Sequence, residues 1–281
     1  MNLLVATQSL IQMADHLGIE YRELPPELKA GRDPRELGWR EKNAAEKTLF
    51  LLLQGYFAGQ QKRIAERLQF ISKSNPFFDA LDDLWWTDED LILRGYLLDY
   101  LTRAAVGSVN LHHAWTRKRF GVIVDDTLVD TMAADWARKY SSKLVTRVNS
   151  TTRKAIRAAT ENFVLTPGAT LQDMMEQLPF KESRAQSIAI TETTAAYSAG
   201  ERVYTEELQA RNPSLKIMRI WYTNRDTYYE GRVRRGVCVI CAGLEGQKIR
   251  VDQQFKFKGK TYDGPPSHVA CRCWTSRLVD V

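Results

Sequence analysis

All four cysteines of this 281-residue chain lie between Cys238 and Cys273, and the preceding 237 residues contain none. Cys238 and Cys241 form a C-x-x-C pair, and His268, Cys271 and Cys273 follow after a loop. Two close groups of ligands separated by a loop are typical of a structural zinc site, because a tight turn brings two sulfurs to metal–sulfur distances of about 2.3 Å. The spacing therefore predicts one zinc ion (Zn²⁺) that stabilises a small C-terminal subdomain.

Five candidate ligands compete for four places around this ion. Cys238 and Cys241 take the first two and Cys273 the third, and His268 and Cys271 are alternatives for the fourth. Four protein ligands would close the site, which indicates a structural ion rather than a catalytic one. The alternatives are four cysteines that bind no metal and a redox C-x-x-C pair. A redox pair normally begins a helix after a strand, whereas a basic, irregular stretch precedes this one.

The composition limits the class of protein. Hydrophobic residues make up 44% of the chain, which is enough to bury a sizeable core. The longest apolar run, residues 49–53, is far shorter than the roughly 20 residues of a membrane span. The N-terminus also lacks the pattern of a secretory signal, so we expect an intracellular protein with no membrane partner. The formal charge of +6 permits contact with nucleic acid or an acidic protein surface.

We expect an α+β fold, with a mainly α-helical N-terminal region followed by a small zinc-stabilised α+β domain that contains a β-hairpin. The predicted parts are an N-terminal arm (1–40), a helical region (41–180) and a C-terminal domain (181–281) whose zinc-binding subdomain starts near residue 213. Prolines and glycines interrupt regular structure in the arm. Apolar residues at steps of three, four and seven mark the helical region.

Several local patterns predict individual helices. Periodicity predicts one helix over 41–71 and another over 87–106, with Thr87 as the N-cap of the second. A third helix begins near Thr127, after an acidic pair, and the polar run 149–152 is expected to interrupt it.

The later part of the chain carries turn and strand signals. Thr170 is predicted to cap a short helix, and Ser183 to open, through a capping box, a helix that ends before Asn212. The segment 215–223 predicts a strand, and 255–262 alternates around a glycine and predicts a β-hairpin.

Two groups of basic residues are candidates for contact with nucleic acid. The segment 136–160 has seven basic residues and no acidic one, and a helical wheel places five of them on one side. Such a stripe is either a solvated helix face or a surface that binds phosphates. The second group lies beside Trp221, Tyr222, Tyr228 and Tyr229, which could stack on bases or belong to a strand core. The candidate residues are Lys139, Lys143, Arg147, Lys154, Arg157, Arg232, Arg234 and Arg235.

Three segments of the C-terminal part together carry a family resemblance. The first, within 184–200, reads R-A-x-x-I-A-x-T-E-T-T followed by A-Y-x-A-G. The second, within 221–247, reads W-x-T-x-x-D and then V-C-x-x-C-x-x-L-x-G-Q. The third, within 265–273, reads P-P-x-H-x-x-C-R-C. In order and spacing they resemble the phage Mu F-like head morphogenesis proteins, also described as SPP1 gene 7-like minor head proteins.

The resemblance implies a minor virion protein that acts in phage head morphogenesis at the portal vertex. The implied partners are the portal protein, the scaffold or the major capsid protein, with packaged double-stranded DNA as a further partner. The implied location is the interior of the phage head, and the host cytoplasm during assembly. Two features depart from the family pattern. Ile190 replaces the usual basic residue before the Thr-Glu pair, and residues 228–231 lengthen the loop before the C-x-x-C pair.

Two other functions remain open from the sequence. One is a zinc-containing module that binds nucleic acid. The other is a toxin-like enzyme, a nuclease or an ADP-ribosyltransferase-like protein, in which Arg184 and Glu192 would be catalytic. Because Glu192 falls in a predicted helix and no paired carboxylates converge with a histidine, we expect a protein that is not an enzyme and has no catalytic residues.

Overall fold

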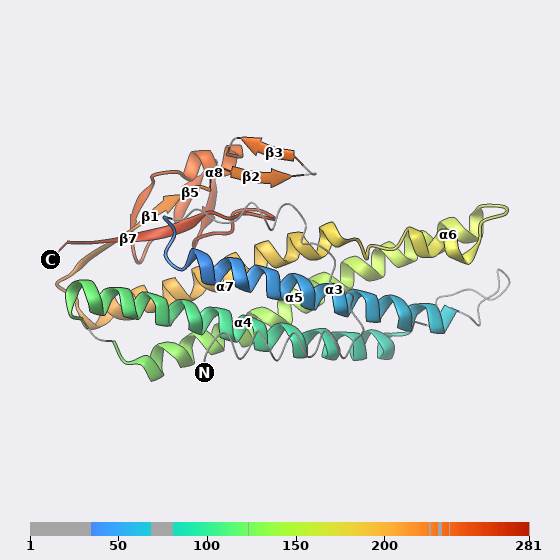
Figure 1. Ribbon diagram of the computed structural model, residues 1–281, viewed down its shortest axis with the longest axis horizontal. Coiled ribbons are helices and arrows are strands. Elements are labelled where there is room, and N and C mark those ends of the chain that lie inside the picture. Colours follow the sequence, from blue (N-terminus) through green and yellow to red (C-terminus); the bar gives the residue numbers. More distant parts are fainter. Residues whose placement is uncertain are drawn as a thin grey trace. The chain divides into compact units, whose positions relative to one another are not determined.

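The computed structural model describes residues 35–68, 81–122, 124–224, 226–229, 232–235 and 237–280 (Figure 1). Nearly all of the predicted arm, residues 1–40, lies outside the described residues. The strands formed by 226–229 and 232–235 are described by their backbone alone.

Four long helices dominate the described chain, and the predicted α+β fold class is confirmed. They are α3 (Trp39–Leu68), α4 (Asp83–Phe120), α5 (Asp126–Leu165) and α7 (Glu182–Arg211). A short helix, α6 (Leu171–Glu176), lies between α5 and α7 in the sequence. None of the helices within the described ranges is long and apolar enough to cross a membrane.

The chain forms two compact units, and each is built from separated segments. The described part of the first, here called the helical unit, comprises residues 51–68, 81–99 and 139–185. The second, here called the mixed unit, comprises described residues from Arg35 to Phe50, from Tyr100 to Arg138 and from Gln186 onward. Each of the four long helices contributes one part to each unit. The predicted domain limits stay predictions.

The helical unit has an apolar core and a buried polar network. The Tyr56 hydroxyl lies 3.1 Å from Glu89 Oε2 and 3.0 Å from Asn149 Oδ1, and Gln60 Nε2 donates to the same hydroxyl at 2.8 Å. These bonds satisfy polar groups that would otherwise be costly to bury. The apolar core consists of Ile64, Leu81, Trp85, Trp86, Ile156, Ala159, Met174 and Leu178.

The mixed unit contains a three-stranded antiparallel sheet in the order β4-β1-β7. The central strand β1 (Lys216–Tyr222) pairs with β7 (Trp274–Asp280) along its whole length and with β4 (Lys248–Arg250). Residues from α4, α5, α7, β1 and the loop between α4 and α5 form one core: Ala105, Val109, Val124, Val129, Ala133, Val203, Tyr204, Leu208 and Ile217.

Two hairpins complete the mixed unit. The first joins β2 (Asp226–Tyr229) to β3 (Arg232–Arg235). The second joins β5 (Phe255–Phe257) to β6 (Lys260–Tyr262), and it confirms the predicted hairpin. Its two turn residues both have positive φ, 47° at Lys258 and 74° at Gly259, as a tight type I′ turn requires.

Several local predictions are confirmed. Asp125 Oδ1 accepts from the backbone N–H of Thr127, so the acidic pair opens α5. Thr170 caps α6 in a reciprocal capping box with Asp173. The helix α7 ends at Arg211, directly before Asn212, and the predicted strand over 215–223 is β1.

Other local predictions were wrong. The second helix, α4, extends from Asp83 to Phe120 rather than from 87 to 106. It starts earlier than expected because Asp82 Oδ1, not Thr87, accepts a backbone N–H of the first turn, that of Trp85. Thr87 lies inside this helix and donates to the Asp83 carbonyl instead. α7 begins at Glu182, so Ser183 is already in its first turn and does not cap it.

The predicted break at 149–152 is also wrong, because α5 continues through it. Thr151 and Thr152 direct their hydroxyls to the carbonyls of the preceding turn, at 2.9 and 3.0 Å. Asn149 donates to Asp90 Oδ1 at 2.6 Å. The polar side chains therefore find partners without leaving the helix.

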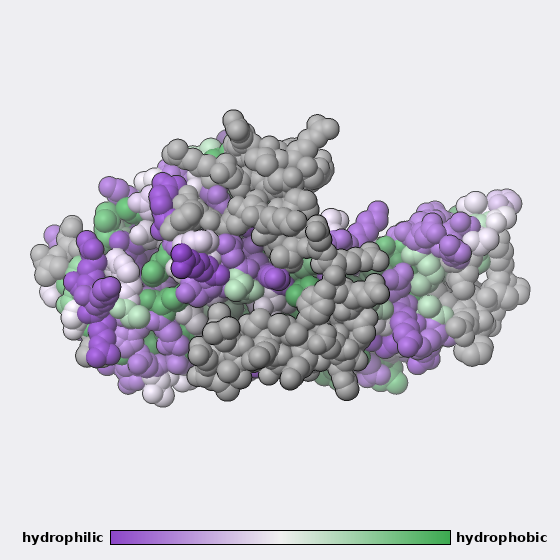
Figure 2. Space-filling view, viewed as in Figure 1, coloured by the Kyte–Doolittle hydropathy of each residue, from purple (hydrophilic) through white to green (hydrophobic). Residues whose placement is uncertain are grey.

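The visible surface of the described residues is mostly hydrophilic, with scattered hydrophobic residues between (Figure 2). Among the exposed large hydrophobic residues are Leu84 and Leu91 on α4 and Val239 and Val269 near the cysteines. Exposed apolar residues of this kind are common on folded proteins.

Candidate metal centre

The C-x-x-C pair lies at the start of α8 (Val239–Leu244). Cys238 is the N-cap residue, in an extended conformation (φ −63°, ψ 156°), and its Sγ accepts the backbone N–H of Cys241 at 3.4 Å. A sulfur N-cap directs both thiols to the same side of the first turn. The histidine and the other two cysteines lie in the irregular segment that leads into β7.

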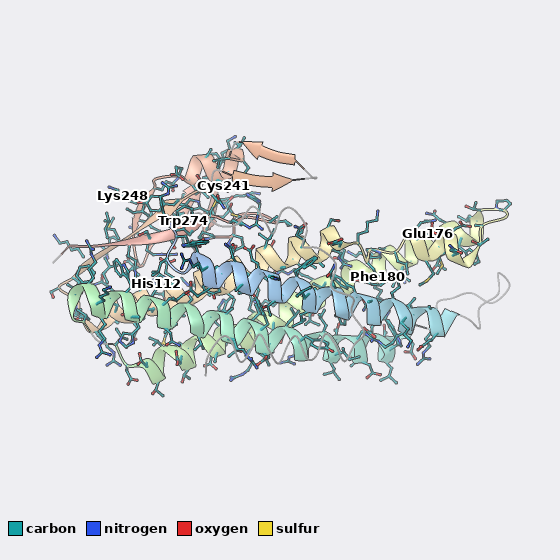
Figure 3. All side chains as sticks on the ribbon, in the orientation of Figure 1. His112, Glu176, Phe180, Cys241, Lys248 and Trp274 are labelled. Carbon is teal, nitrogen blue, oxygen red and sulfur yellow. The ribbon has the colours of Figure 1, made fainter. Side chains whose placement is uncertain are left out.

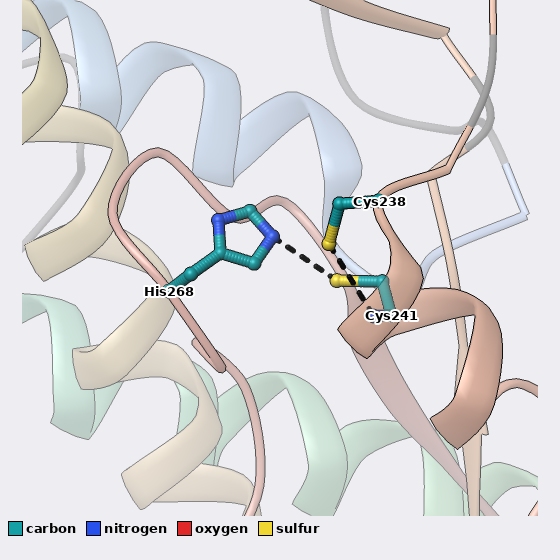
Figure 4. A group of neighbouring side chains, drawn as sticks. All are labelled: Cys238, Cys241 and His268. Atoms are coloured by element: carbon teal, nitrogen blue, oxygen red, sulfur yellow. Dashed lines mark hydrogen bonds between the residues drawn. The ribbon is translucent and has the colours of Figure 1, made fainter.

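The five candidate ligands form two overlapping triplets that share Cys241. One contains Cys238, Cys241 and His268, and the other contains Cys241, Cys271 and Cys273. Within each triplet the ligand atoms lie within 4.8 Å of one another. Figure 4 shows the first triplet, in which the imidazole points toward the Cys241 sulfur. The structure therefore brings together all five residues that the spacing predicted, in an arrangement that could hold a metal ion.

The distances can be compared with those of a tetrahedral site. A metal–sulfur distance of about 2.3 Å places two ligand sulfurs about 3.8 Å apart. The Cys241 and Cys271 sulfurs are 3.9 Å apart. His268 Nε2 lies 3.1 Å from Cys241 Sγ, which is a hydrogen-bond contact, slightly closer than the roughly 3.5 Å expected for two ligands of one ion. A small outward movement of the imidazole would match the tetrahedral geometry.

Burial and hydrogen bonding distinguish the thiols. Cys241, Cys271 and Cys273 are buried, whereas Cys238 is exposed. Hydrogen bonds from Cys241 and Cys273 lower the pKa of Cys271 well below its ordinary value. The bond to Cys271 raises the pKa of Cys241, and bonds to Cys241 and Cys271 raise the pKa of Cys273. Hydrogen bonding within the cluster thus favours one thiolate, at Cys271. If further buried thiols lose their protons, a cation is needed to balance the added negative charge.

Residues of α7 fix the segment that carries the ligands. The backbone N–H of Ala270 donates to Thr191 Oγ1 at 2.9 Å, and Thr194 Oγ1 donates to the Cys271 carbonyl at 2.9 Å. Ala270 has a positive φ of 57°, a backbone conformation that an alanine adopts only when its surroundings impose it. The Thr-rich part of α7 therefore positions two of the candidate ligands.

A buried ion pair holds the same segment from another side. Arg272, between two ligand cysteines, donates from Nε and Nη2 to Glu46 Oε2 at 3.1 and 3.0 Å. Both side chains are almost completely buried, with 3% and 1% of their surface exposed. Glu46 belongs to α3, 226 residues away in the sequence, and no local pattern indicated its role. Ser267 was missed as well, although its Oγ lies 3.3 Å from Cys241 Sγ.

An apolar cluster lies against the cysteines. Trp221 is fully buried, and its ring lies edge-on to Phe255 with 5.1 Å between ring centroids. It shares the cluster with Cys241, Leu244, Cys271 and Cys273. In Figure 3 the labelled Cys241 and Trp274 mark this part of the mixed unit. Trp221 is therefore a core residue, as one of the two sequence interpretations held.

The first group of predicted nucleic-acid-binding residues lies on α5. All five side chains are exposed: Lys139, Lys143, Arg147, Lys154 and Arg157. Arg147 Nη2 lies 3.4 Å from the Tyr140 hydroxyl, so Tyr140 lies beside this basic side of α5. For the second group, Arg232, Arg234 and Arg235, the side chains lie outside the described residues.

Arg184 has structural partners within the helical unit. Its guanidinium donates to the carbonyls of Val148 and Pro179, at 2.9 and 3.1 Å, and to Thr152 Oγ1. Burial lowers the pKa of Arg184 below its ordinary value. Glu192 is buried on α7 in the mixed unit.

Comparison with known proteins adds no relative. No family model, no curated protein and no solved structure matches this chain. The resemblance to phage head morphogenesis proteins therefore rests on the residues quoted above.

Proposed function

We propose that this protein is a non-enzymatic minor head protein of a phage, and that a structural zinc ion stabilises its C-terminal part. One observation carries the proposal. The three segments of the family-like pattern, which are far apart in the sequence, meet at the cysteines. Thr191 and Thr194 of the first segment bind the backbone of the third, and Trp221 and Cys241 of the second share a core with Cys271.

This convergence supports a common structural role for the residues of the pattern. Threonines bind the ligand segment, the arginine between the cysteines is neutralised by Glu46, and the tryptophan covers the thiols. Every one of these contacts supports the shape of the segment, and five candidate ligands are available for the four positions of a closed site. A closed site of this kind stabilises a fold rather than catalysing a reaction.

Zinc is the ion that this ligand set fits best. Thiolates and imidazole are the ligands that tetrahedral zinc prefers, whereas calcium and magnesium require oxygen ligands. Cys241 takes part in both triplets, so it is a ligand in every arrangement. Cys271, whose sulfur lies 3.9 Å from that of Cys241, is the second ligand, and two of Cys238, Cys273 and His268 complete the site.

The metal part of the proposal is tested by elemental analysis of the purified full chain. We expect about one zinc per chain, because four ligands bind a single ion. Removal by a strong chelator at neutral pH should abolish hydrogen-exchange protection of peptides around Trp221, and added zinc should restore it. A metal-free chain with unchanged protection in these peptides would contradict a structural zinc ion.

The head-assembly part requires a separate experiment. Procapsids and mature heads produced by a phage that encodes this chain should contain it, together with the portal protein. A deletion of the gene should reduce the yield of infectious particles, and the Cys241→Ser variant should reproduce the defect. Absence of the chain from both kinds of particle would refute the head-protein proposal and leave the zinc proposal standing.

A second proposed contact is with double-stranded DNA. The exposed basic side chains on α5 form one stripe without a neighbouring acidic residue between 136 and 160. Binding through phosphates weakens as salt increases, with a slope that depends on the number of phosphates contacted. Titration of a DNA duplex at several salt concentrations tests this contact, and binding that does not respond to salt would argue against it.

A further inference from the structure

A cavity of about 660 Å³ lies within the mixed unit, apart from the cysteines. Its walls come from α7, from β1 and β4 of the sheet, and from the loop 251–254. A volume of this size is typical of sites that hold small organic molecules. Its apolar wall is formed by Ile249 and Val251, and the rest of the lining is polar.

The carboxylates that line the cavity already have cationic partners. Asp263 pairs with Arg202 Nη1 at 3.1 Å and also accepts from Gln254 at 2.6 Å. Glu206 lies 3.8 Å from Arg202 Nε. Asp252 pairs with Arg250, which is outside the lining, at 2.8 Å. The acidic side chains of the cavity are therefore largely neutralised.

Arg219, in contrast, lines the cavity with two guanidinium nitrogens that have no hydrogen-bond partner among the described residues. Only 1% of this residue is exposed, and its Nε and Nη2 are buried with no hydrogen-bond partner. Its guanidinium lies over the Phe255 ring, 5.4 Å from the centroid. Glu201 attracts it electrostatically, but among the described residues no carboxylate forms an ion pair with Arg219.

A buried guanidinium without hydrogen bonds is destabilising, because burial removes its hydration and nothing replaces it. A residue that lowers stability in this way is often retained for function. An anion in the cavity would supply the missing partner. Lys256, which also lines the cavity, adds a second positive charge.

We propose that this cavity binds a small organic carboxylate, with Arg219 as the recognition residue and with Ile249 and Val251 against the apolar part of the ligand. A carboxylate matches the planar fork of an arginine. A multiply charged phosphate fits less well, because Glu206, Asp252 and Asp263 also line the space. The proposal is independent of the head-protein role and of the zinc ion.

Benzoate is a suitable probe, because it combines one carboxylate with an apolar ring. Benzamide has almost the same shape and no charge, and inorganic phosphate carries charge without an apolar part. In the zinc-loaded full chain, benzoate at constant ionic strength should raise the melting temperature in a saturable way, with an apparent Kd of about 1 mM or lower. Benzamide and phosphate should have at least about tenfold weaker effects.

Three variants test whether benzoate binds in this cavity. Arg219→Met should bind benzoate about tenfold or more weakly, and its own melting temperature without benzoate is the baseline, because it also removes a charge that attracts the buried Glu201. Lys256→Gln, at an exposed position, should lower the affinity for benzoate by about threefold. Lys248→Met is the matched control, because Lys248 is exposed on β4 and does not line the cavity (Figure 3).

Two results would overturn the proposal. The first is a wild-type chain that shows no saturable response to benzoate or responds more strongly to phosphate. The second is an unchanged benzoate affinity in a folded Arg219→Met variant. If Arg219→Met does not fold, Lys256→Gln decides the question, with the unchanged Lys248→Met variant as its reference.

Discussion

The helical unit and the mixed unit bury polar side chains in different ways. In the helical unit, Tyr56, Gln60 and Glu89 form a network between long helices that already share an apolar core. In the mixed unit, three of the strands have only three residues each, and the segment from Pro265 to Cys273 has no regular structure. Short strands and irregular backbone contribute little stability of their own.

The comparison shows where each unit obtains its stability. The helices of the first unit satisfy their backbone internally and use polar contacts as a supplement. The mixed unit joins distant segments through the pair Arg272–Glu46 and brings five candidate metal ligands together, which would cross-link these segments if they bind the proposed zinc ion. Small domains are often stabilised by disulfides or structural metal ions where the hydrophobic core is not sufficient alone. Loss of a cross-link should therefore affect the mixed unit far more than the helical unit.

The largest effect should follow loss of the shared ligand. Structural zinc contributes on the order of 10 kcal/mol to the folding of small domains, so Cys241→Ser should abolish protection from hydrogen exchange around the sheet and α8. Peptides from the helical unit should keep their protection. The exposed Cys238 serves as the comparison, and Cys238→Ser should have a smaller effect because His268 and the other cysteines remain.

Equal loss of protection from hydrogen exchange in both units after Cys241→Ser would contradict the proposed difference in how the two units are stabilised. It would mean that the units unfold together, and that the cluster stabilises the whole described chain.

The buried ion pair should have the second largest effect. Glu46→Ala leaves the Arg272 guanidinium buried without its partner, so the free energy of unfolding should fall by about 3–5 kcal/mol. The double variant Glu46→Met, Arg272→Met should recover most of the loss, because it removes both charges. Denaturant unfolding of the single and double variants measures the difference.

The helical unit offers a matched ion pair. Arg63 Nη2 lies 2.9 Å from Glu89 Oε2, but 35% of the arginine side chain is exposed. Glu89→Gln leaves this partly hydrated arginine behind rather than a buried charge, so it should lower stability by less than about 2 kcal/mol. A loss as large as that of Glu46→Ala would contradict the proposed difference between the units.

These contacts also show what the sequence could and could not predict. The C-x-x-C pair, the Thr170 N-cap and the hairpin turn at Lys258 and Gly259 depend on neighbours within a few residues, and all three form as expected. The partner of Arg272 is 226 residues away, so its identity depends on the tertiary fold. A pattern of spacing alone cannot supply such a contact.

The errors have equally local causes. Thr87 resembled an N-cap, but Asp82 lies earlier and accepts the first free backbone N–H of α4. The run 149–152 resembled a break, yet its threonine hydroxyls bind carbonyls of the preceding turn and Asn149 binds Asp90. In both cases a polar side chain had more than one possible partner nearby, and only the bond from Asn149 to Asp90 depends on tertiary packing.

The third prediction concerns pH and the mixed unit. Burial, and then the charges of Arg277 and Lys42, lower the pKa of His112 well below its ordinary value. The unfolded chain therefore binds a proton near pH 6.5 that the folded chain does not bind. Stability should be full above this pH and fall as the pH decreases, by about 1.4 kcal/mol per pH unit for this one group.

The His112→Gln variant isolates this contribution, because glutamine can accept from Arg277 and does not titrate. His112 Nδ1 accepts from Arg277 Nη2 at 2.8 Å in the wild type. The difference in unfolding free energy between wild type and variant should change between pH 7 and pH 5. A pH-independent difference would show that His112 is not kept neutral by the fold.

The smallest effect on stability should come from the basic stripe of the helical unit. Lys143 and Lys154 are exposed on α5, so Lys143→Gln with Lys154→Gln should change the free energy of unfolding by less than about 0.5 kcal/mol. If the stripe binds DNA, the slope of log affinity against log salt should decrease by about 1 for each lost phosphate contact. Arg153→Gln is the matched control on the same helix, because Arg153 pairs with Asp83 at 2.6 Å and lies over the Trp86 ring. Equal changes in slope for the stripe and the control would indicate a general charge effect rather than a DNA-binding surface, and the helical unit would then be a scaffold alone.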